Sequence, residues 1–292
     1  MPAGMDTTGL RVRPGRTVNL RSYDPAETRP FKTKNQAAGQ LEDDIARLVA
    51  LQERLYAHDR WSVLLIFQAM DAAGKDSAIK HVMSGLNPQG TQVFSFKRPS
   101  DEELDHDYLW RTTKALPERG RIGIFNRSYY EEVLVVRVHP EILARQRLPA
   151  SLVTRRVWTE RYEDINAFER YLARNGTLIR KFFLHVSKEE QRRRFLARLD
   201  EPAKNWKFAA ADVDERARWD DYMKAYEQAL SKTSTNDAPW FIVPADHKWF
   251  TRLAIARLVV EALESVDLAF PKASRAHLKE LAEARKRLES GA

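Results

Sequence analysis

The stretch from residue 62 to residue 82, SVLLIFQAMDAAGKDSAIKHV, gives the strongest indication of the fold. An apolar run ends in the small-residue turn DAAG, Lys75 follows, and an amphipathic run begins. This order of strand, turn and helix is that of the phosphate-binding loop G-x-x-x-x-G-K-[ST]. When the two are aligned on Gly74 and Lys75, Ala69 replaces the first glycine and Asp76 replaces the hydroxyl residue. The question is therefore which polyanion such an altered loop would hold.

The retained parts of the loop are sufficient for anion binding. Backbone amides of the turn, the Lys75 ammonium and the positive end of the following helix would all point at one site. Lys75 is expected to be catalytic and to neutralise the transferred group, and the residues expected to contact the substrate here are Ala72, Ala73, Gly74, Asp76 and Ser77.

Asp71 is the unusual member of the turn. A carboxylate inside a phosphate cradle repels its ligand unless a cation lies between them. We therefore expect Asp71 to act through Mg²⁺, or to orient an incoming phosphate. The alternative is that Asp71 only caps the helix from outside.

Five short apolar runs alternate with longer amphipathic segments along the chain. The expected strands cover residues 62–69, 91–96, 121–126, 178–186 and 240–245. Continuous apolar character is typical of parallel strands that are covered on both faces. Serines at 100 and 187, each with a glutamate three residues later, predict capping boxes at two helix starts. The pattern predicts a doubly wound α/β fold, with a mostly parallel five-stranded sheet flanked by helices and ligands at the carboxyl ends of its strands.

Composition and charge narrow the possible classes of protein. The 292 residues include no cysteine, which fits a reducing compartment and excludes thiolate chemistry. No run reaches the roughly 18 apolar residues that a membrane span needs, and no secretion signal is visible, so we expect a cytoplasmic protein. A formal charge of +8 indicates attraction to polyanions.

A second polar motif, IGIFNRSYY, follows the expected third strand at residues 122–130. P-loop proteins usually carry a magnesium-binding aspartate at this point, and here the position is Asn126. Arg127 is a candidate catalytic cation because its planar fork can bridge donor and acceptor phosphates. The alternative is a structural ion pair with Glu131 or Glu132. Tyr130 could stack on a base, or it could fill the core.

A basic segment follows the expected fourth strand, from residue 188 to about residue 212. At this place in nucleotide kinases, a helical lid closes over the phosphates and brings arginines to the transferring group. Arg194 and Arg198 share one flank of the expected helix and are the catalytic candidates. Arg193, Lys204 and Lys207 are further candidates for substrate contacts, although a charge run can also be a solvated face.

The ordered motifs MDAAGKDSAIKHVMSGLNPQGTQVFSFKRPSDEELDHDYLWR, GRIGIFNRSYYEEVLVVRVHP and SKEEQRRRFLARLDEPAKNWKF resemble the polyphosphate kinase 2 family. The resemblance covers roughly residues 37 to 267 and is nearest to the branch that acts on nucleoside mono- and diphosphates. It implies a P-loop kinase-like fold and Mg²⁺-dependent transfer of phosphate from inorganic polyphosphate to a nucleotide. Other branches resemble DRSWY at the second motif, so Asn126 is a departure that leaves metal binding by this residue in doubt.

A polymeric donor would need a long cationic path, for which Lys80, Lys97 and Arg98 are candidates beside the lid arginines. The expected organisation is an extended arm over residues 1–36, a P-loop kinase-like catalytic domain over 37–270 and a helical tail over 271–292. Expected partners are polyphosphate and adenine nucleotides, with guanine left open, in a homo-oligomer that binds neither membrane nor nucleic acid. The alternatives are an ATP-dependent nucleoside monophosphate kinase and a non-catalytic polyanion- or nucleic-acid-binding protein.

Overall fold

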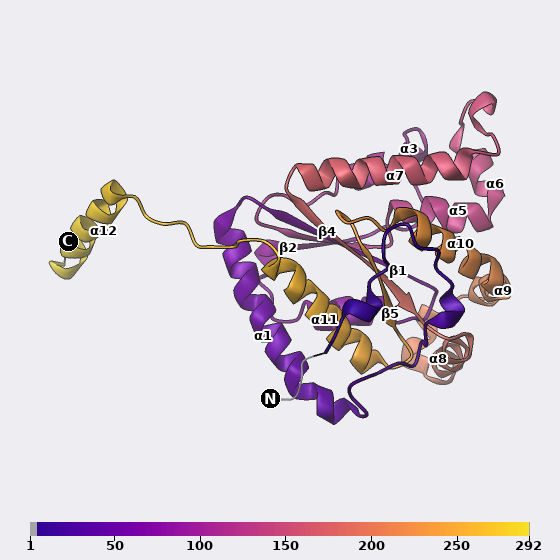
Figure 1. Ribbon diagram of the computed structural model, residues 1–292, viewed down its shortest axis with the longest axis horizontal. Helices are drawn as coiled ribbons and strands as arrows, with labels where there is room; N and C mark the ends of the chain where they lie inside the picture. The colour runs from indigo at the N-terminus through magenta and orange to yellow at the C-terminus, as the bar shows by residue number, and fades with distance from the viewer. Residues whose placement is uncertain (1–4, 292) are drawn as a thin grey trace.

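The computed structural model describes residues 5–291 and places one five-stranded sheet at the centre of the chain (Figure 1). The strand order is β2-β3-β1-β4-β5, and every neighbouring pair is parallel. The strands are β1 (Ser62–Ala69), β2 (Thr91–Ser95), β3 (Ile122–Asn126), β4 (Thr177–His185) and β5 (Trp240–Pro244). The predicted α/β fold with a five-stranded sheet is confirmed, and the sheet is parallel throughout.

Helices cover both faces of the sheet. On one face, α1 (Lys34–His58) packs against α11 (Lys248–Glu264), which also contacts α2 (Lys75–Val82). On the other face, α7 (Val157–Arg174) packs on β4 and on α10 (Trp219–Thr233). The remaining helices are α3 (Asp101–Leu104), α4 (Trp110–Thr113), α5 (Val135–Val138), α6 (Pro140–Leu143), α8 (Lys188–Asp200), α9 (Ala211–Ala217) and α12 (Arg275–Glu289).

The two helical layers explain why the central strands are apolar on both sides. The β1 residues 63 to 67 have no exposed surface, and β5 is buried along its whole length. Burial of this apolar surface favours the folded state by about 25 cal/mol per Å². The carboxyl end of β1, which carries the DAAG turn, is thus held rigidly at the middle of the sheet.

A buried ion pair joins β4 to α7 and settles the place of Tyr130. Lys181 donates from Nζ to Glu169 Oε2 at 2.6 Å and to the Tyr130 hydroxyl at 2.7 Å. Tyr129 and Tyr130 both donate to Glu169 Oε1, at 2.9 and 2.8 Å. Burial lowers the pKa of Lys181 to about 8. Tyr130 therefore fills the core, as one of the two sequence alternatives had it.

The two ends of the chain differ in how they relate to the central body. The N-terminal segment lies against β5, where Val12 N–H donates to the Trp240 carbonyl at 2.9 Å, and it buries Met5, Val18 and Leu20. At the other end, α12 lies apart from the sheet and its helices (Figure 1). None of the described helices is both long and apolar enough to cross a membrane.

Candidate active site

The turn after β1 has the geometry of a phosphate-binding loop. Gly74 is the N-cap of α2 with a φ of +98°, a value that favours glycine, and Ala72 also lies in the left-handed region with a φ of +60°. A non-glycine residue in this region is strained and is often found at functional sites. No side chain caps α2, so the alternative in which Asp71 serves as the helix cap is wrong.

A cleft of about 640 Å³ opens in front of this loop. It collects most of the expected site residues from the carboxyl ends of β1, β2 and β3 and from α8 and the segment after it. Those that line it are Asp71, Ala72, Ala73, Gly74, Lys75, Asp76, Ser77, Lys97, Arg98, Asn126, Arg127, Arg194, Arg198 and Lys204.

Arg127 lines both the cleft and the cavity beside it. Its backbone has a φ of +64°, directly after β3, and its guanidinium lies 3.3 Å from Asp71 Oδ1 and 3.4 Å from Glu131 Oε2. The charge of Glu131 has the largest effect on the pKa of Arg127 and raises it. Burial lowers this pKa, but Glu131 and Asp71 together outweigh burial, so the pKa is raised. Burial raises the pKa of Glu131, against the opposing effect of the Arg127 charge. Arg127 thus stays charged between two carboxylates while its side chain remains 42% exposed to a substrate.

Lys75 is the first residue of α2 and is partly buried. Burial and the nearby charge of Arg127 lower the pKa of Lys75, with Asp76 acting in the opposite direction. Asp76 itself accepts a hydrogen bond from Asn126 Nδ2 at 2.7 Å. Asn126 occupies the position where P-loop proteins usually have a second acid, and here it donates a hydrogen bond to a carboxylate.

Arg194 is buried beneath the loop and uses all five of its N–H donors on protein acceptors. Nη1 donates to the carbonyls of Ala72 and Ala73 at 3.0 and 2.8 Å, and Nη2 to those of Ala245 and Asp246 at 2.7 and 3.0 Å. Nε donates to Glu190 Oε1 at 2.6 Å. Arg194 thus ties α8 to the loops after β1 and β5.

The start of α8 has only half of the predicted capping box. Ser187 Oγ accepts from Glu190 N–H at 3.1 Å, as expected. The Ser187 N–H, however, donates to Asp246 at 2.8 Å, because the Glu190 carboxylate is engaged by Arg193 and Arg194. At Ser100 both bonds of the predicted box are present.

Four predicted contact residues do not line the cleft or cannot be placed in it. Lys80 is exposed on α2, and Arg193 is 74% exposed and paired with Glu190. Tyr130 is in the core, as described above. The Lys207 side chain lies outside the part of the chain whose side chains the structure describes.

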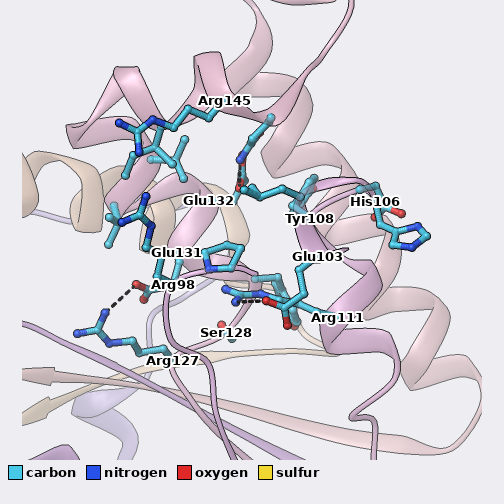
Figure 2. A pocket seen from close by; sticks show the side chains of 18 of the residues that line it. Arg98, Glu103, His106, Tyr108, Arg111, Arg127, Ser128, Glu131, Glu132 and Arg145 are labelled. Atoms are coloured by element: carbon cyan, nitrogen blue, oxygen red, sulfur yellow. Dashed lines mark hydrogen bonds and ion pairs between the residues drawn. The ribbon is translucent and has the colours of Figure 1, made fainter. Parts of the chain in front are cut away.

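A second cavity, of about 500 Å³, adjoins the cleft and shares Lys97, Arg98 and Arg127 with it (Figure 2). Its wall includes the apolar residues Val135, Val136, Ile142 and Leu148. Figure 2 shows Arg127 and Glu131 at one end of this cavity and Glu132 and Arg145 further along it.

Polar contacts fix the far wall of the second cavity. Glu132 is buried, accepts from Gln146 Nε2 at 2.9 Å and pairs with Arg161 at 3.1 Å. Arg161 stands over the ring of Tyr108, 4.3 Å from its centroid. The cavity is therefore a rigid, partly apolar slot that opens toward Arg127.

Sequence reasoning missed Lys248 and Gln191. Lys248 begins α11 directly after β5 and lines the cleft. The rule that ligands bind at the carboxyl ends of parallel strands would have pointed to it. Gln191 is buried on α8 and donates to the Asp71 carbonyl at 3.0 Å. No spacing in the sequence distinguishes it from the other polar residues of that helix.

Comparison with known proteins agrees with this arrangement. Residues 32–271 match the family Polyphosphate kinase 2. The chain belongs to the polyphosphate kinase 2 family.

Named members of this family resemble the chain over nearly its whole length. An ADP-polyphosphate phosphotransferase of Rhodopseudomonas palustris is 55% identical over 97% of this chain and 98% of its own. An AMP/ADP-polyphosphate phosphotransferase of Meiothermus ruber is 44% identical over 92% and 97%. The crystal structure of polyphosphate kinase 2 from Arthrobacter aurescens TC1 superposes with a TM-score of 0.87 at 41% identity, and covers 97% of this chain and 99% of its own.

The cleft carries carboxylates of the kind that bind a magnesium ion together with substrate phosphates. No group of three or more carboxylate or imidazole side chains that could hold a metal exists among residues 5–291. Mg²⁺ in phosphoryl-transfer sites is typically bound by one or two carboxylates together with substrate phosphates. Asp71, whose side chain is 39% exposed in the cleft, and the neighbouring Asp76 offer such a set.

Proposed function

We propose that this chain transfers the terminal phosphoryl group of inorganic polyphosphate to a nucleoside mono- or diphosphate. The observation that carries the proposal is that a cationic cleft and a partly apolar cavity meet at Arg127. The first suits a chain of phosphates, and the second suits a nucleoside with its base against apolar walls. The family relatives named as polyphosphate phosphotransferases support the same reaction.

The donor phosphates would lie over the DAAG turn, with Lys75, Arg198 and Lys204 around them. The acceptor nucleoside would occupy the second cavity and direct its terminal phosphate past Arg98 toward Arg127. Both substrates then approach one point from opposite directions, which is the geometry that in-line transfer requires.

In the transfer, an oxygen of the acceptor phosphate forms a bond to the terminal phosphorus while the bond to the bridging oxygen of polyphosphate breaks. Lys75 and Arg127 stabilise the charge on the moving group, and no covalent phosphoenzyme is needed. Asp71 and Asp76 would hold a magnesium ion that neutralises phosphate charge. Arg194, whose donors are all occupied, would position the loop, whereas Arg198 remains a candidate for direct contact.

The segment from α8 to α9 would close over the cleft as a lid. Arg194 and Gln191 anchor the first turns of α8 to the loop, so the moving part would begin near Arg198. We place the enzyme in the cytoplasm together with its nucleotide substrates. The homo-oligomer also stays a proposal, for which sedimentation with and without α12 is the first measurement.

The deciding experiment supplies polyphosphate as the sole phosphate donor. Formation of ATP from ADP, and of ADP from AMP, is expected in the presence of Mg²⁺, and separate assays with GMP and GDP define the base preference. Absence of any product with polyphosphate, combined with turnover of AMP when ATP is added, would favour the ATP-dependent kinase instead.

A further inference from the structure

Asp246 lies shortly after β5 and joins three separate parts of the chain. Its backbone N–H donates to the carbonyl of Pro25, in the N-terminal segment, at 3.0 Å. Its Oδ1 accepts from the Ser187 N–H, at the start of α8, at 2.8 Å. Its carbonyl accepts from Nη2 of Arg194 at 3.0 Å. Among the described residues, Asp246 is not one of those that line the cleft or the acceptor cavity, so any effect on the substrate must pass through its neighbours.

The contact with Arg194 leads from Asp246 to the phosphate loop. Nη2 of Arg194 donates to the carbonyls of Ala245 and Asp246. Nη1 of the same guanidinium donates to the carbonyls of Ala72 and Ala73. Because a guanidinium is planar and rigid, the segment after β5 and the turn after β1 are held in a fixed arrangement around it.

The Asp246 carboxylate fixes the helix that carries Arg194. It accepts from the N–H of Ser187, the residue that caps α8, and a negative charge at the start of a helix is also favoured by the helix dipole. Asp246 therefore holds both the backbone from which Arg194 projects and the guanidinium at the end of its side chain.

The N-terminal segment supports Asp246 from the side away from the cleft. The segment is itself anchored, since Leu20 is buried and its N–H donates to Glu227 Oε1 on α10 at 2.8 Å. Pro25 follows in a turn, in which the Glu27 N–H donates to the Asp24 carbonyl at 3.2 Å. The family match begins at residue 32, so Pro25 lies outside the matched segment.

We propose that Asp246 is a positioning residue for phosphoryl transfer, which links the N-terminal segment to Arg194 and through it to the phosphate loop. A shift of about 1 Å in groups that hold a substrate can lower a rate by about 100-fold, so support of the loop from behind affects catalysis. The kinetic part of this inference rests on the proposed function, whereas the hold on the loop can be measured without any substrate.

The first test measures amide hydrogen exchange in the turn, residues 70–75, without substrate. Asp246→Ala removes the acceptor of the Ser187 N–H, and exchange in the turn should become about tenfold faster, the usual loss for a hydrogen bond to a charged group. Asp246→Asn keeps an oxygen acceptor and should stay within about threefold of wild type. The matched control Asp237→Ala removes a carboxylate before β5, at the opposite edge of the sheet, and should leave this exchange unchanged.

The place where exchange changes separates positioning from simple helix capping. If Asp246→Ala exchanged faster only in the first turn of α8, Asp246 would be a helix cap alone and the proposal would be overturned. Pro25→Gly tests the N-terminal segment, because glycine keeps the carbonyl but loosens the turn that presents it. Exchange in residues 70–75 should become about threefold faster in Pro25→Gly, and an unchanged rate would overturn the role of the N-terminal segment.

The second test is kinetic and uses polyphosphate with saturating ADP, at a temperature below the Tm of every variant. The kcat of Asp246→Ala should fall by about tenfold, whereas its KM for ADP should stay within about twofold of wild type. Asp246→Asn should recover most of the lost kcat, and Asp237→Ala should lose none.

A double variant tests whether Asp246 acts through Arg194. Addition of Asp246→Ala to Arg194→Met should cause little further loss of kcat, because both changes release the same guanidinium. Losses that multiply would mean that Asp246 acts by another route, and the proposal would be overturned. A wild-type chain that transfers nothing from polyphosphate would refute the proposed function, while the exchange measurement would still decide the hold on the loop.

Discussion

Replacement of Arg194 by methionine tests whether this arginine holds the phosphate loop or acts on the substrate. Methionine replaces the stem of Arg194 as far as Nε, but it lacks the rest of the guanidinium and removes all five N–H donors. Four backbone carbonyls and Glu190 then lose a partner, and two of the carbonyls belong to the loop itself. We therefore expect lower stability as well as lower activity.

The size of the effect follows from the burial of Arg194. Removal of one partner from a buried charged pair typically costs about 3–5 kcal/mol. We take the lower figure, about 3 kcal/mol, because Glu190 keeps Arg193 as a partner. The entropy of unfolding of a 292-residue chain is about 0.6 kcal/mol per kelvin, so the Tm of Arg194→Met should fall by about 5 °C.

The assay is a thermal unfolding scan of wild type, Arg194→Met and the matched variant Arg198→Met, followed by kinetics with polyphosphate. Arg198 lies one turn further along α8, lines the cleft and is more exposed than Arg194, so its variant should lose less Tm than Arg194→Met while its KM for polyphosphate rises. If Arg194→Met unfolded at the wild-type temperature while its kcat fell, the guanidinium would act on the substrate and would not be needed to hold the loop.

Three further predictions concern the reacting groups. Lys75→Met should reduce kcat by about 10²- to 10³-fold with an unchanged Tm, because it removes one group that stabilises the transferring charge; an unaltered kcat would exclude the loop from catalysis. Arg127→Lys keeps the charge but not the planar fork, and single-turnover kinetics should show a similar loss; a rate within about twofold of wild type would show that any cation suffices. Because the pKa of Lys75 is lowered, its ammonium loses a proton below the usual pH of 10.5, and kcat/KM should therefore decrease with rising pH before pH 10.5 is reached. If Lys75→Arg showed the same decrease in kcat/KM at alkaline pH, another group would be the one that titrates.

Residues that directly follow a strand were the part of the site that sequence could predict. Lys75 and Arg127 come after β1 and β3, and parallel strands bring their carboxyl ends to one edge whatever the details of packing. The same rule applies to Lys248, which was overlooked because no motif surrounds it. The strand positions were predictable for a related reason, since burial on both faces leaves a continuous apolar run.

Roles that depend on tertiary packing were beyond the sequence. Arg194 and Arg198 share a flank of one helix, yet only Arg194 is buried against the loop carbonyls. Tyr130 was open between stacking and the core until Glu169 and Lys181 were seen to bind its hydroxyl. Helical spacing defines which residues are neighbours, but it does not say which element lies opposite them.

The loop after β1 is fastened from two directions, by Arg194 and by Gln191. These contacts should keep its shape nearly unchanged as phosphate binds and leaves. Phosphate binding should then cost little conformational entropy of the loop, so the binding free energy is not reduced by a need to order it. Such a site can release one donor and bind the next without a change in the loop. This property suits an enzyme whose polyphosphate substrate becomes one phosphate shorter at every turnover.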